Sequence, residues 1–375
     1  MKFRALISRP TFGKISRMYS SATSSDEVLL KWKNQKLIIT LNRPKALNAL
    51  NIPMVKTIYG ALKEVVDNKA ADLVIIKSNN EKAFCAGGDV VAVSKSGQTN
   101  GNVHKEFFFT EYIVNNMIGT LNVPYVALIH GITMGGGCGL SINGRFRVAT
   151  EKTMLAMPET ALGLFPDVGA THFLSRLNHN LGQFLALTGF RLKGADVLHS
   201  GMATHYVNST SLPDVEQELI NLSNPTDSSV DKLLKQHQPN DLPPFTLKDN
   251  LKVIEKCFGA NSYEDVLKCL QSEGSKFATD QLEELKKMSP SSLKVAFRQI
   301  KNGKNMKFSD VFPVEYRMAQ HFCANHDFHE GCRAILIDKD RNPKWKPADI
   351  SEVTDEMVDS YFAPAEVELN LNAKL

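Results

Sequence analysis

Residues 125–139 read YVALIHGITMGGGCG, and this stretch carries the strongest fold signal in the chain. The apolar residues 125–129 predict a buried strand, and residues 138–143 have the composition of a short helix. Between them, adjacent glycines leave backbone N–H groups that no side chain shields. Residues 83–89 read AFCAGGD and repeat the arrangement after another apolar run. The sequence therefore predicts two strand ends at which peptide N–H groups stay open to a ligand.

Two acids stand in a third stretch, residues 157–169, which reads MPETALGLFPDVG. They are Glu159 and Asp167, and the Pro and Gly residues around them predict a loop. Two N–H donors together with two carboxylates are suited to polarising a carbonyl and moving protons around it. We therefore expect the two glycine turns and this acidic stretch to form one active site.

Strands and helices alternate along the first half of the chain. Strands are expected at residues 28–30, 37–41, 73–76, 125–129 and 146–149, and a helix begins at Pro53. This alternation predicts an α/β fold. After a polar stretch that ends at Pro244, helices are expected at residues 251–258, 263–271, 279–287 and 289–300.

These motifs together resemble the crotonase (enoyl-CoA hydratase/isomerase) superfamily. Residues 42–50, NRPKALNAL, are similar to its CoA-binding turn. Residues 129–137 and 163–169 resemble the 3-hydroxyisobutyryl-CoA hydrolase branch, as do the tail segments 326–331, 337–340 and 343–347. The resemblance extends from about Val28 to about Pro347.

The resemblance implies an α/β fold with a crotonase ββα spiral core at residues 28–225. A C-terminal helical region at residues 226–375 would complete the active site. The implied activity is hydrolysis of 3-hydroxyisobutyryl-CoA to 3-hydroxyisobutyrate and CoA in valine catabolism, with 3-hydroxypropionyl-CoA as a second substrate. Neither a metal nor a cofactor is expected, because CoA arrives as part of the substrate.

The family pattern also implies roles for individual residues. Gly88 and Gly136 would form the oxyanion hole. Glu159 would attack the thioester as a nucleophile or activate a water as general base, and Asp167 would orient the substrate hydroxyl or protonate the leaving thiolate. Glu111 would contact the 3-hydroxyl. The implied substrate-binding set is Glu111, Gly136, Glu159 and Asp167.

The CoA moiety would lie against Lys45, Ala46 and Ala86. The neighbouring Arg43 is a further candidate for a phosphate contact, since basic side chains suit phosphate. From the C-terminal region, Lys339 and Trp345 are expected to close over the ligand.

Two other functions stay open. An enoyl-CoA hydratase or isomerase of the same fold is disfavoured because hydratases carry a second Glu at the position of Gly139 and a small residue at the position of Asp167. A non-catalytic, mitochondrial ribosome-associated protein of this fold is disfavoured because the acids and both oxyanion glycines are present.

The N-terminal residues predict a location in the cell. Residues 1–19 contain five basic residues and no acid, a composition typical of a mitochondrial transit peptide that directs a chain to the matrix. The terminal tripeptide Ala373-Lys374-Leu375 is close to the peroxisomal signal, so that compartment is the alternative.

Charge gives little reason to expect macromolecular partners. Without the five basic residues of the leader, the 44 basic residues of the chain fall to 39 against 40 acidic ones. Such a balance favours neither nucleic acid nor a membrane as partner. Many crotonases assemble as trimers or hexamers, so a homo-oligomer is also expected as an option.

The six cysteines include no Cys-x-x-Cys pair, so we expect reduced thiols. Cys85 and Cys138 are alternative nucleophiles, but neither has a clear His partner in the sequence, and packing beside the glycines is the simpler explanation. His326, His329 and Glu330 match no zinc spacing.

Overall fold

The computed structural model describes residues 27–98 and 102–375. The expected transit peptide at residues 1–19 lies outside this described part. The chain enters through a hairpin of β1 (Val28–Lys33) and β2 (Lys36–Leu41). Its two central turn residues, Asn34 and Gln35, both have positive φ, as a two-residue type I′ turn requires. The two strands expected from the sequence at residues 28–30 and 37–41 are confirmed.

The larger sheet has six strands in the order β1-β2-β3-β5-β7-β10. Its remaining members are β3 (Leu73–Ser78), β5 (Tyr125–Ile129), β7 (Phe146–Ala149) and β10 (His205–Tyr206). Only β1 and β2 pair antiparallel, and the other pairs are parallel. The apolar runs that predicted β3, β5 and β7 fit this, because parallel strands are covered on both faces.

A smaller sheet follows the order β4-β6-β8-β9. It consists of β4 (Ala83–Cys85), β6 (Ile132–Met134), β8 (Met154–Ala156) and β9 (Leu192–Lys193). Each of β3, β5 and β7 in the larger sheet is followed in sequence by one strand of the smaller sheet. The helices α3 (Val90–Gln98), α4 (Val103–Thr120) and α5 (Gly136–Ile142) complete the first two turns. This repeated strand–strand–helix winding confirms the expected ββα spiral.

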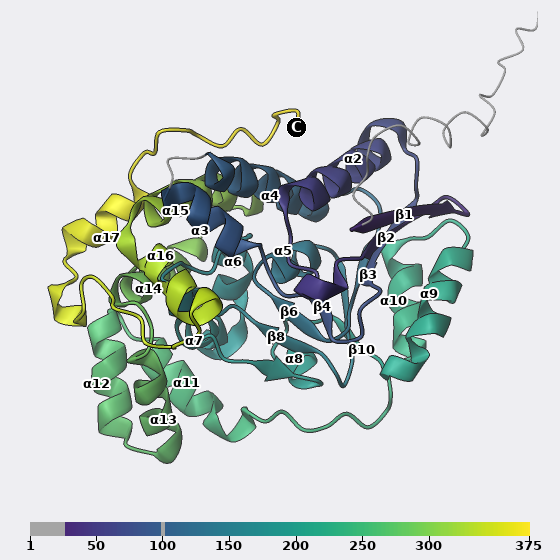
Figure 1. Cartoon of the computed structure of the whole chain (residues 1–375). Coiled ribbons are helices and arrows are strands. Elements are labelled where there is room, and N and C mark those ends of the chain that lie inside the picture. Colours follow the sequence, from purple (N-terminus) through teal and green to yellow (C-terminus); the bar gives the residue numbers. More distant parts are fainter. Residues whose placement is uncertain (1–26, 99–101) are drawn as a thin grey trace, which may run out of the picture.

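Helices cover the outer face of the larger sheet. Figure 1 shows α9 (Leu212–Asn221) and α10 (Asp227–Gln236) side by side there. Val215, Leu219 and Leu234 pack against apolar side chains of the strands in a separate cluster. Because α10 follows residue 225, it belongs by sequence to the expected C-terminal region but packs on the sheet. The division of the chain at residue 225 stays a prediction.

The C-terminal helices lie on the opposite side of the molecule (Figure 1). They are α11 (Leu251–Phe258), α12 (Tyr263–Glu273), α13 (Lys276–Leu285), α14 (Pro290–Gly303), α15 (Phe308–Ala324), α16 (His326–Cys332) and α17 (Asp355–Phe362). The four helices expected between residues 251 and 300 are confirmed. α15 packs against α4, and α14 packs against α7 (Leu181–Thr188), so this region shares one hydrophobic core with the spiral.

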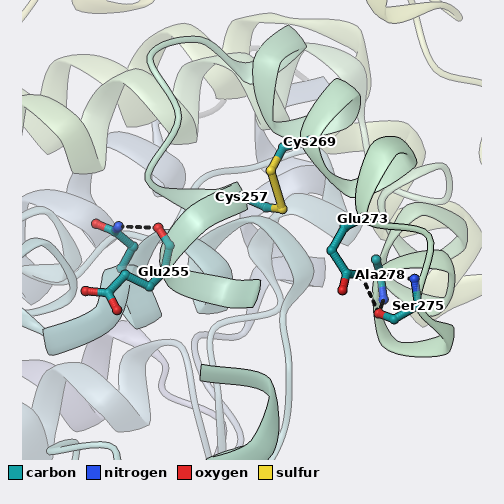
Figure 2. Close-up of a disulfide and its surroundings, with 7 residues drawn as sticks. Glu255, Cys257, Cys269, Glu273, Ser275 and Ala278 are labelled. Atoms are coloured by element: carbon teal, nitrogen blue, oxygen red, sulfur yellow. Dashed lines mark hydrogen bonds between the residues drawn. A yellow bond between two sulfur atoms is a disulfide. The ribbon is translucent and has the colours of Figure 1, made fainter. Parts of the chain in front are cut away.

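Cys257 on α11 and Cys269 on α12 form a disulfide (Figure 2). The expectation that all six cysteines are reduced is wrong for this pair. The two helices follow one another in the chain and pack together, which brings the Cα atoms to 5.2 Å although the residues are 12 apart in sequence. Cysteines 12 residues apart do not form a Cys-x-x-Cys motif, so the sequence pattern did not indicate this pair.

No helix within the described residues has the length and hydrophobicity needed to span a bilayer.

Candidate active site

The two glycine turns meet at one edge of the smaller sheet. β4 and β6 run parallel, so the turns that follow them lie side by side. A Cβ atom placed on Gly136 would lie 3.4 Å from the Gly88 nitrogen. Neither the Gly88 N–H nor the Gly136 N–H has a hydrogen-bond partner in the described part of the chain. The two residues predicted for the oxyanion hole are thus adjacent and offer free donors.

Glycine is required at these positions by close contacts. A Cβ on Gly88 would lie 2.9 Å from the ring of Phe107, and one on Gly137 only 2.4 Å from the Cys85 carbonyl oxygen. The backbone at Gly87 has a φ of +112°, which favours glycine. Side chains here would force the two turns apart and separate the donors.

Glu159 points at the second glycine turn. It begins the short 3-10 helix η2 (Glu159–Leu162) directly after β8. Its Oε1 lies 2.9 Å from the place of a Cβ on Gly135. Its Oε2 is buried and has no hydrogen-bond partner among residues 27–98 and 102–375. The carboxyl group is therefore held beside the free donors with one oxygen uncommitted.

Glu111 approaches the same turn from α4. Its Oε1 lies 2.5 Å from the place of a Cβ on Gly136 and, like the Glu159 Oε2, is a buried oxygen without a partner in the described structure. The structure thus brings Glu111 and Glu159 to adjacent glycines from two distant parts of the chain.

Asp167 is buried and accepts a 2.8 Å hydrogen bond from the Tyr112 hydroxyl. The next residue, Val168, has a φ of +55°, which is a strained conformation for a β-branched side chain. Such strain persists only where the surroundings hold it and is common at active sites. Tyr112 was not predicted as a site residue, although its position next to Glu111 on α4 was a signal.

Glu315 holds the segment after Asp167 in place. This buried residue of α15 accepts hydrogen bonds from the Gly169 N–H at 2.7 Å and the Thr171 N–H at 2.9 Å. Burial raises the pKa of Glu315 to about 8, although the two N–H donors act in the opposite direction. No sequence motif marked Glu315, because it lies within an ordinary apolar helix.

The pKa of each of the three acids of the site is raised, mainly by burial. Burial is the main cause of the raised pKa of Glu111 and of Glu159, and the charge of Asp167 adds to both. Burial also raises the pKa of Asp167, to about 7, while the Tyr112 hydrogen bond favours its ionised form. Of the three acids, Asp167 is the one whose ionised form is supported by a side-chain hydrogen bond.

Gly139 lies about one turn beyond Gly136 on α5 and faces α4 and the Asp167 segment. A Cβ on Gly139 would lie 2.7 Å from Asn115 Oδ1 and 2.7 Å from the Val168 Cβ. The space that a side chain at position 139 would need is filled by these two residues. The site therefore has no room for an acid there.

The predicted CoA-binding residues lie together on two joined loops. Lys45 is exposed on the 3-10 helix η1 (Pro44–Ala46), and the Ala86 N–H donates to the Leu47 carbonyl. The Ala46 N–H donates to the Arg43 carbonyl, so both alanines have committed their N–H groups. The Ala46 carbonyl accepts from the Ala49 N–H at 2.9 Å and keeps one lone pair, so this lone pair, the Ala86 carbonyl and the Lys45 side chain are the groups that can contact a ligand.

Arg43 forms two ion pairs in the described structure, and its contact with a phosphate stays a prediction. Its guanidinium pairs with Glu27 at 3.1 Å and with Asp89 at 3.0 Å. Since Asp89 follows Gly88 directly, these ion pairs tie the start of β1 to the first glycine turn.

The tail segments that contain Asp327 and Lys346 hold η2 in place. Within α16, Asp327 accepts from the Ser289 hydroxyl at 2.6 Å and from the Lys346 N–H at 2.8 Å. A Cβ on Gly163, which ends η2, would lie 2.2 Å from the Asp327 carbonyl oxygen. These segments thus fix the helical turn that carries Glu159.

The two residues expected to close over the ligand differ in their surroundings. Trp345 is buried, and its indole N–H donates to the Lys287 carbonyl at 3.2 Å, whereas Lys339 is exposed. Their role in covering a ligand stays a prediction.

The rival nucleophiles are unsuited to reaction. Cys85 and Cys138 are fully buried, and burial raises the pKa of both thiols, that of Cys85 to about 12.

The histidine of the tail segment is occupied by other contacts. His329 forms hydrogen bonds with the Ser94 hydroxyl and the Cys323 carbonyl. Over the described residues, no cluster of three metal-ligating side chains is found.

Comparison with known proteins agrees with this geometry. The model of the enoyl-CoA hydratase/isomerase family matches residues 36–362. The mitochondrial 3-hydroxyisobutyryl-CoA hydrolase of Gallus gallus is 51% identical over 345 residues, 91% of this chain and 90% of that protein. The Homo sapiens protein of the same name is 48% identical over 350 residues, 92% and 91% of the two chains.

A solved structure extends the match to three dimensions. The crystal structure of a carnitinyl-CoA dehydratase from Mycobacterium thermoresistibile superimposes with a TM-score of 0.86 at 34% identity, covering 93% of this chain and 100% of that one. The motifs, the spiral, the paired glycine turns and these matches agree. The chain belongs to the enoyl-CoA hydratase/isomerase family.

Proposed function

We propose that this protein hydrolyses 3-hydroxyisobutyryl-CoA to 3-hydroxyisobutyrate and CoA in valine catabolism. The relatives at 48% and 51% identity, which it matches almost end to end, carry the name of that activity. The observation that carries the proposal is the pair of free N–H donors at Gly88 and Gly136 beside the buried carboxyl groups of Glu111 and Glu159, each of which has an uncommitted oxygen. 3-Hydroxypropionyl-CoA is proposed as a second substrate.

The two N–H groups bind the thioester carbonyl oxygen. That oxygen gains negative charge when a nucleophile adds to the carbonyl carbon, and one preorganised donor is worth roughly 2.7–4 kcal/mol in the transition state. Because both donors are fixed by backbone, little reorganisation is needed as the charge develops.

Glu159 then attacks the carbonyl carbon, and the C–S bond breaks to give a mixed anhydride and the CoA thiolate. Water opens the anhydride to release the acid and restore the Glu159 carboxylate. The alternative is that Glu159 removes a proton from a water that attacks directly. Solvent oxygen-18 found in Glu159 after one turnover would support the anhydride, and its absence would support the general-base route.

In this proposal, Asp167 takes up the proton of Glu159 and later releases it. Glu159 has a raised pKa and must lose its proton before it attacks. Asp167, whose ionised form is favoured by the Tyr112 hydrogen bond, accepts that proton and afterwards delivers it to the thiolate of CoA.

The CoA moiety is proposed to lie along the two joined loops. The Ala46 and Ala86 carbonyls suit the exocyclic amino group of adenine, which donates hydrogen bonds, and Lys45 suits a phosphate. No cofactor beyond the CoA of the substrate is proposed. The matrix is proposed as the location, since the relatives are named mitochondrial; Ala373-Lys374-Leu375 keeps the peroxisome as the alternative.

A second candidate is hydration or dehydration of an acyl-CoA, which is favoured by the 34% identity to a solved carnitinyl-CoA dehydratase. The absence of an acid at Gly139 argues against it. The test is thiol release from 3-hydroxyisobutyryl-CoA by residues 20–375, with hydration of crotonyl-CoA followed in parallel.

Glu159→Gln should abolish thiol release, while Glu366→Gln, at an exposed ion pair with Lys105, should leave it intact. Fast hydration without thiol release would overturn the hydrolase. Neither reaction from folded protein would point to a non-catalytic role, which co-sedimentation with ribosomes would then test.

A further inference from the structure

Asn115 is a fully buried side chain whose amide is unpaired. It is 0% exposed, and neither its Nδ2 nor its Oδ1 has a hydrogen-bond partner anywhere in the described structure. Leaving a buried polar group unpaired costs about 1–3 kcal/mol, so both ends of this side chain need an explanation.

The amide belongs to the walls of the active site. Asn115 follows Glu111 by one helical turn on α4, and residues four apart share a helix face. A Cβ on Gly139 would lie 2.7 Å from Asn115 Oδ1 and 3.1 Å from Nδ2. The same Cβ would touch Val168, the neighbour of Asp167. Asn115 therefore lies where α4, α5 and the Asp167 segment meet.

The spacing along α5 matches the length of a hydroxyacyl group. The Glu111 carboxyl lies at Gly136, where the thioester carbonyl would bind, and the Asn115 amide lies at Gly139. Three residues of helix span about 4.5 Å. A hydroxyl oxygen on carbon 3 is separated from the carbonyl carbon by three bonds, roughly 3.8 Å when extended.

The hydrogen-bonding groups of the Asn115 amide limit the kind of ligand that it can bind. It offers a donor and an acceptor, both unused, so a group that satisfies both must itself accept and donate. An ionised carboxylate only accepts, whereas a hydroxyl does both. We propose that Asn115 binds the 3-hydroxyl of the substrate acyl group and sets the preference for 3-hydroxyacyl thioesters. This inference rests on the proposed hydrolase function and adds to it the residue that selects the substrate.

The test compares two thioesters that differ only in the hydroxyl, 3-hydroxyisobutyryl-CoA and isobutyryl-CoA. Asn115→Leu keeps the size of the side chain and removes both polar atoms. Its kcat/KM for the hydroxylated substrate should fall about tenfold or more, because the hydroxyl would be buried unpaired, while that for isobutyryl-CoA stays the same or rises. The readout is the ratio of the two kcat/KM values.

The unliganded stability gives a second readout. Since Asn115→Leu removes two unpaired buried atoms, its Tm should equal or exceed that of the unchanged protein. A purely structural asparagine would give a lower Tm. Asn116→Leu is the matched control, because Asn116 accepts from the Ser309 hydroxyl at 2.7 Å and should leave the substrate ratio unchanged.

Three outcomes would overturn the inference. An equal fall in kcat/KM for both substrates would mean that Asn115 holds the attacking water, and unchanged values for both would mean that Asn115 does not contact the 3-hydroxyl. If Asn115→Leu does not fold, Asn115→Asp and Asn115→Ala are measured instead, and an unchanged ratio in both counts against it. If the unchanged protein hydrolyses neither thioester, the proposed function fails, and calorimetric binding of the two thioesters to protein and variants still decides the role of Asn115.

Discussion

The Tyr112 hydroxyl donates a 2.8 Å hydrogen bond to Oδ2 of Asp167. Both groups are buried, and the bond favours the ionised form of Asp167 whereas burial favours the protonated form. The charge state of Asp167 therefore depends in part on a neutral residue of α4.

Tyr112→Phe should raise the pKa of Asp167 further. A hydrogen bond to a charged group is worth about 1.5–3 kcal/mol, which corresponds to roughly one to two pKa units. We expect kcat/KM for the thioester to fall about tenfold and its acidic limb to move to higher pH. A pH–rate profile measures this, and an unchanged limb would mean that ionisation of Asp167 does not set the acidic limb.

Asp167 should make stability depend on pH. Its pKa is about 7 in the folded chain and near 3.8 when unfolded, so between these values the folded chain binds more protons. The free energy of unfolding therefore falls as pH rises from 4 to 7. Asp167→Asn should reduce that fall by up to about 4 kcal/mol. Urea unfolding at pH 4.5 and pH 7 measures it, with Asp241→Asn at an exposed loop position as control.

Glu315→Gln should destabilise the segment after Asp167. The amide has one acceptor oxygen, so its NH2 group would face one of the N–H donors of Gly169 and Thr171. We expect a loss of about 1–3 kcal/mol in the free energy of unfolding together with a lower kcat. Glu366→Gln on the surface should cost less than about 1 kcal/mol. Equal losses in both variants would count against a positioning role for Glu315.

Gly139→Glu should not create a hydratase. Its Cβ would meet Asn115 and the strained Val168, each at 2.7 Å, so the Asp167 segment would have to move. We expect a loss of about 1–3 kcal/mol in stability, reduced thioester hydrolysis and no hydration of crotonyl-CoA. Thermal unfolding and the two assays check this; efficient hydration by the variant would show that one side chain selects the reaction.

Reduction should loosen the packing of α11 on α12. A disulfide that closes a loop of this size stabilises by about 3 kcal/mol in the chain-entropy model. Cys257→Ser should lower the Tm of the oxidised protein, and reductant should lower the Tm of the unchanged protein to the same value. If reductant has no effect on the unchanged protein, the cysteines are not paired in solution.

Local sequence predicted the parts of the site that lie in motifs. The glycine turns and Glu159 stand next to strands with clear apolar runs, so their positions followed from short-range patterns. Glu111 followed from the resemblance, and the structure brings it to Gly136.

Other features could not be predicted in this way. Glu315 and the Cys257–Cys269 pair depend on how helices pack, which no local pattern records. The unpaired state of Asn115 and the positive φ of Val168 are properties of the folded surroundings, since an isolated segment would satisfy the amide with water and relax the backbone.

The bond between Glu315 and Gly169 spans 146 residues of chain. During synthesis, the segment that carries Asp167 leaves the ribosome long before α15 does. This segment therefore lacks its hydrogen bonds to Glu315 until α15 has been made. The spiral can form earlier, but the acid–base machinery is assembled only when nearly the whole polypeptide has been made. Activity is therefore among the last properties that the folding chain acquires, and a truncated chain that lacks α15 would be inactive even if its sheets were intact.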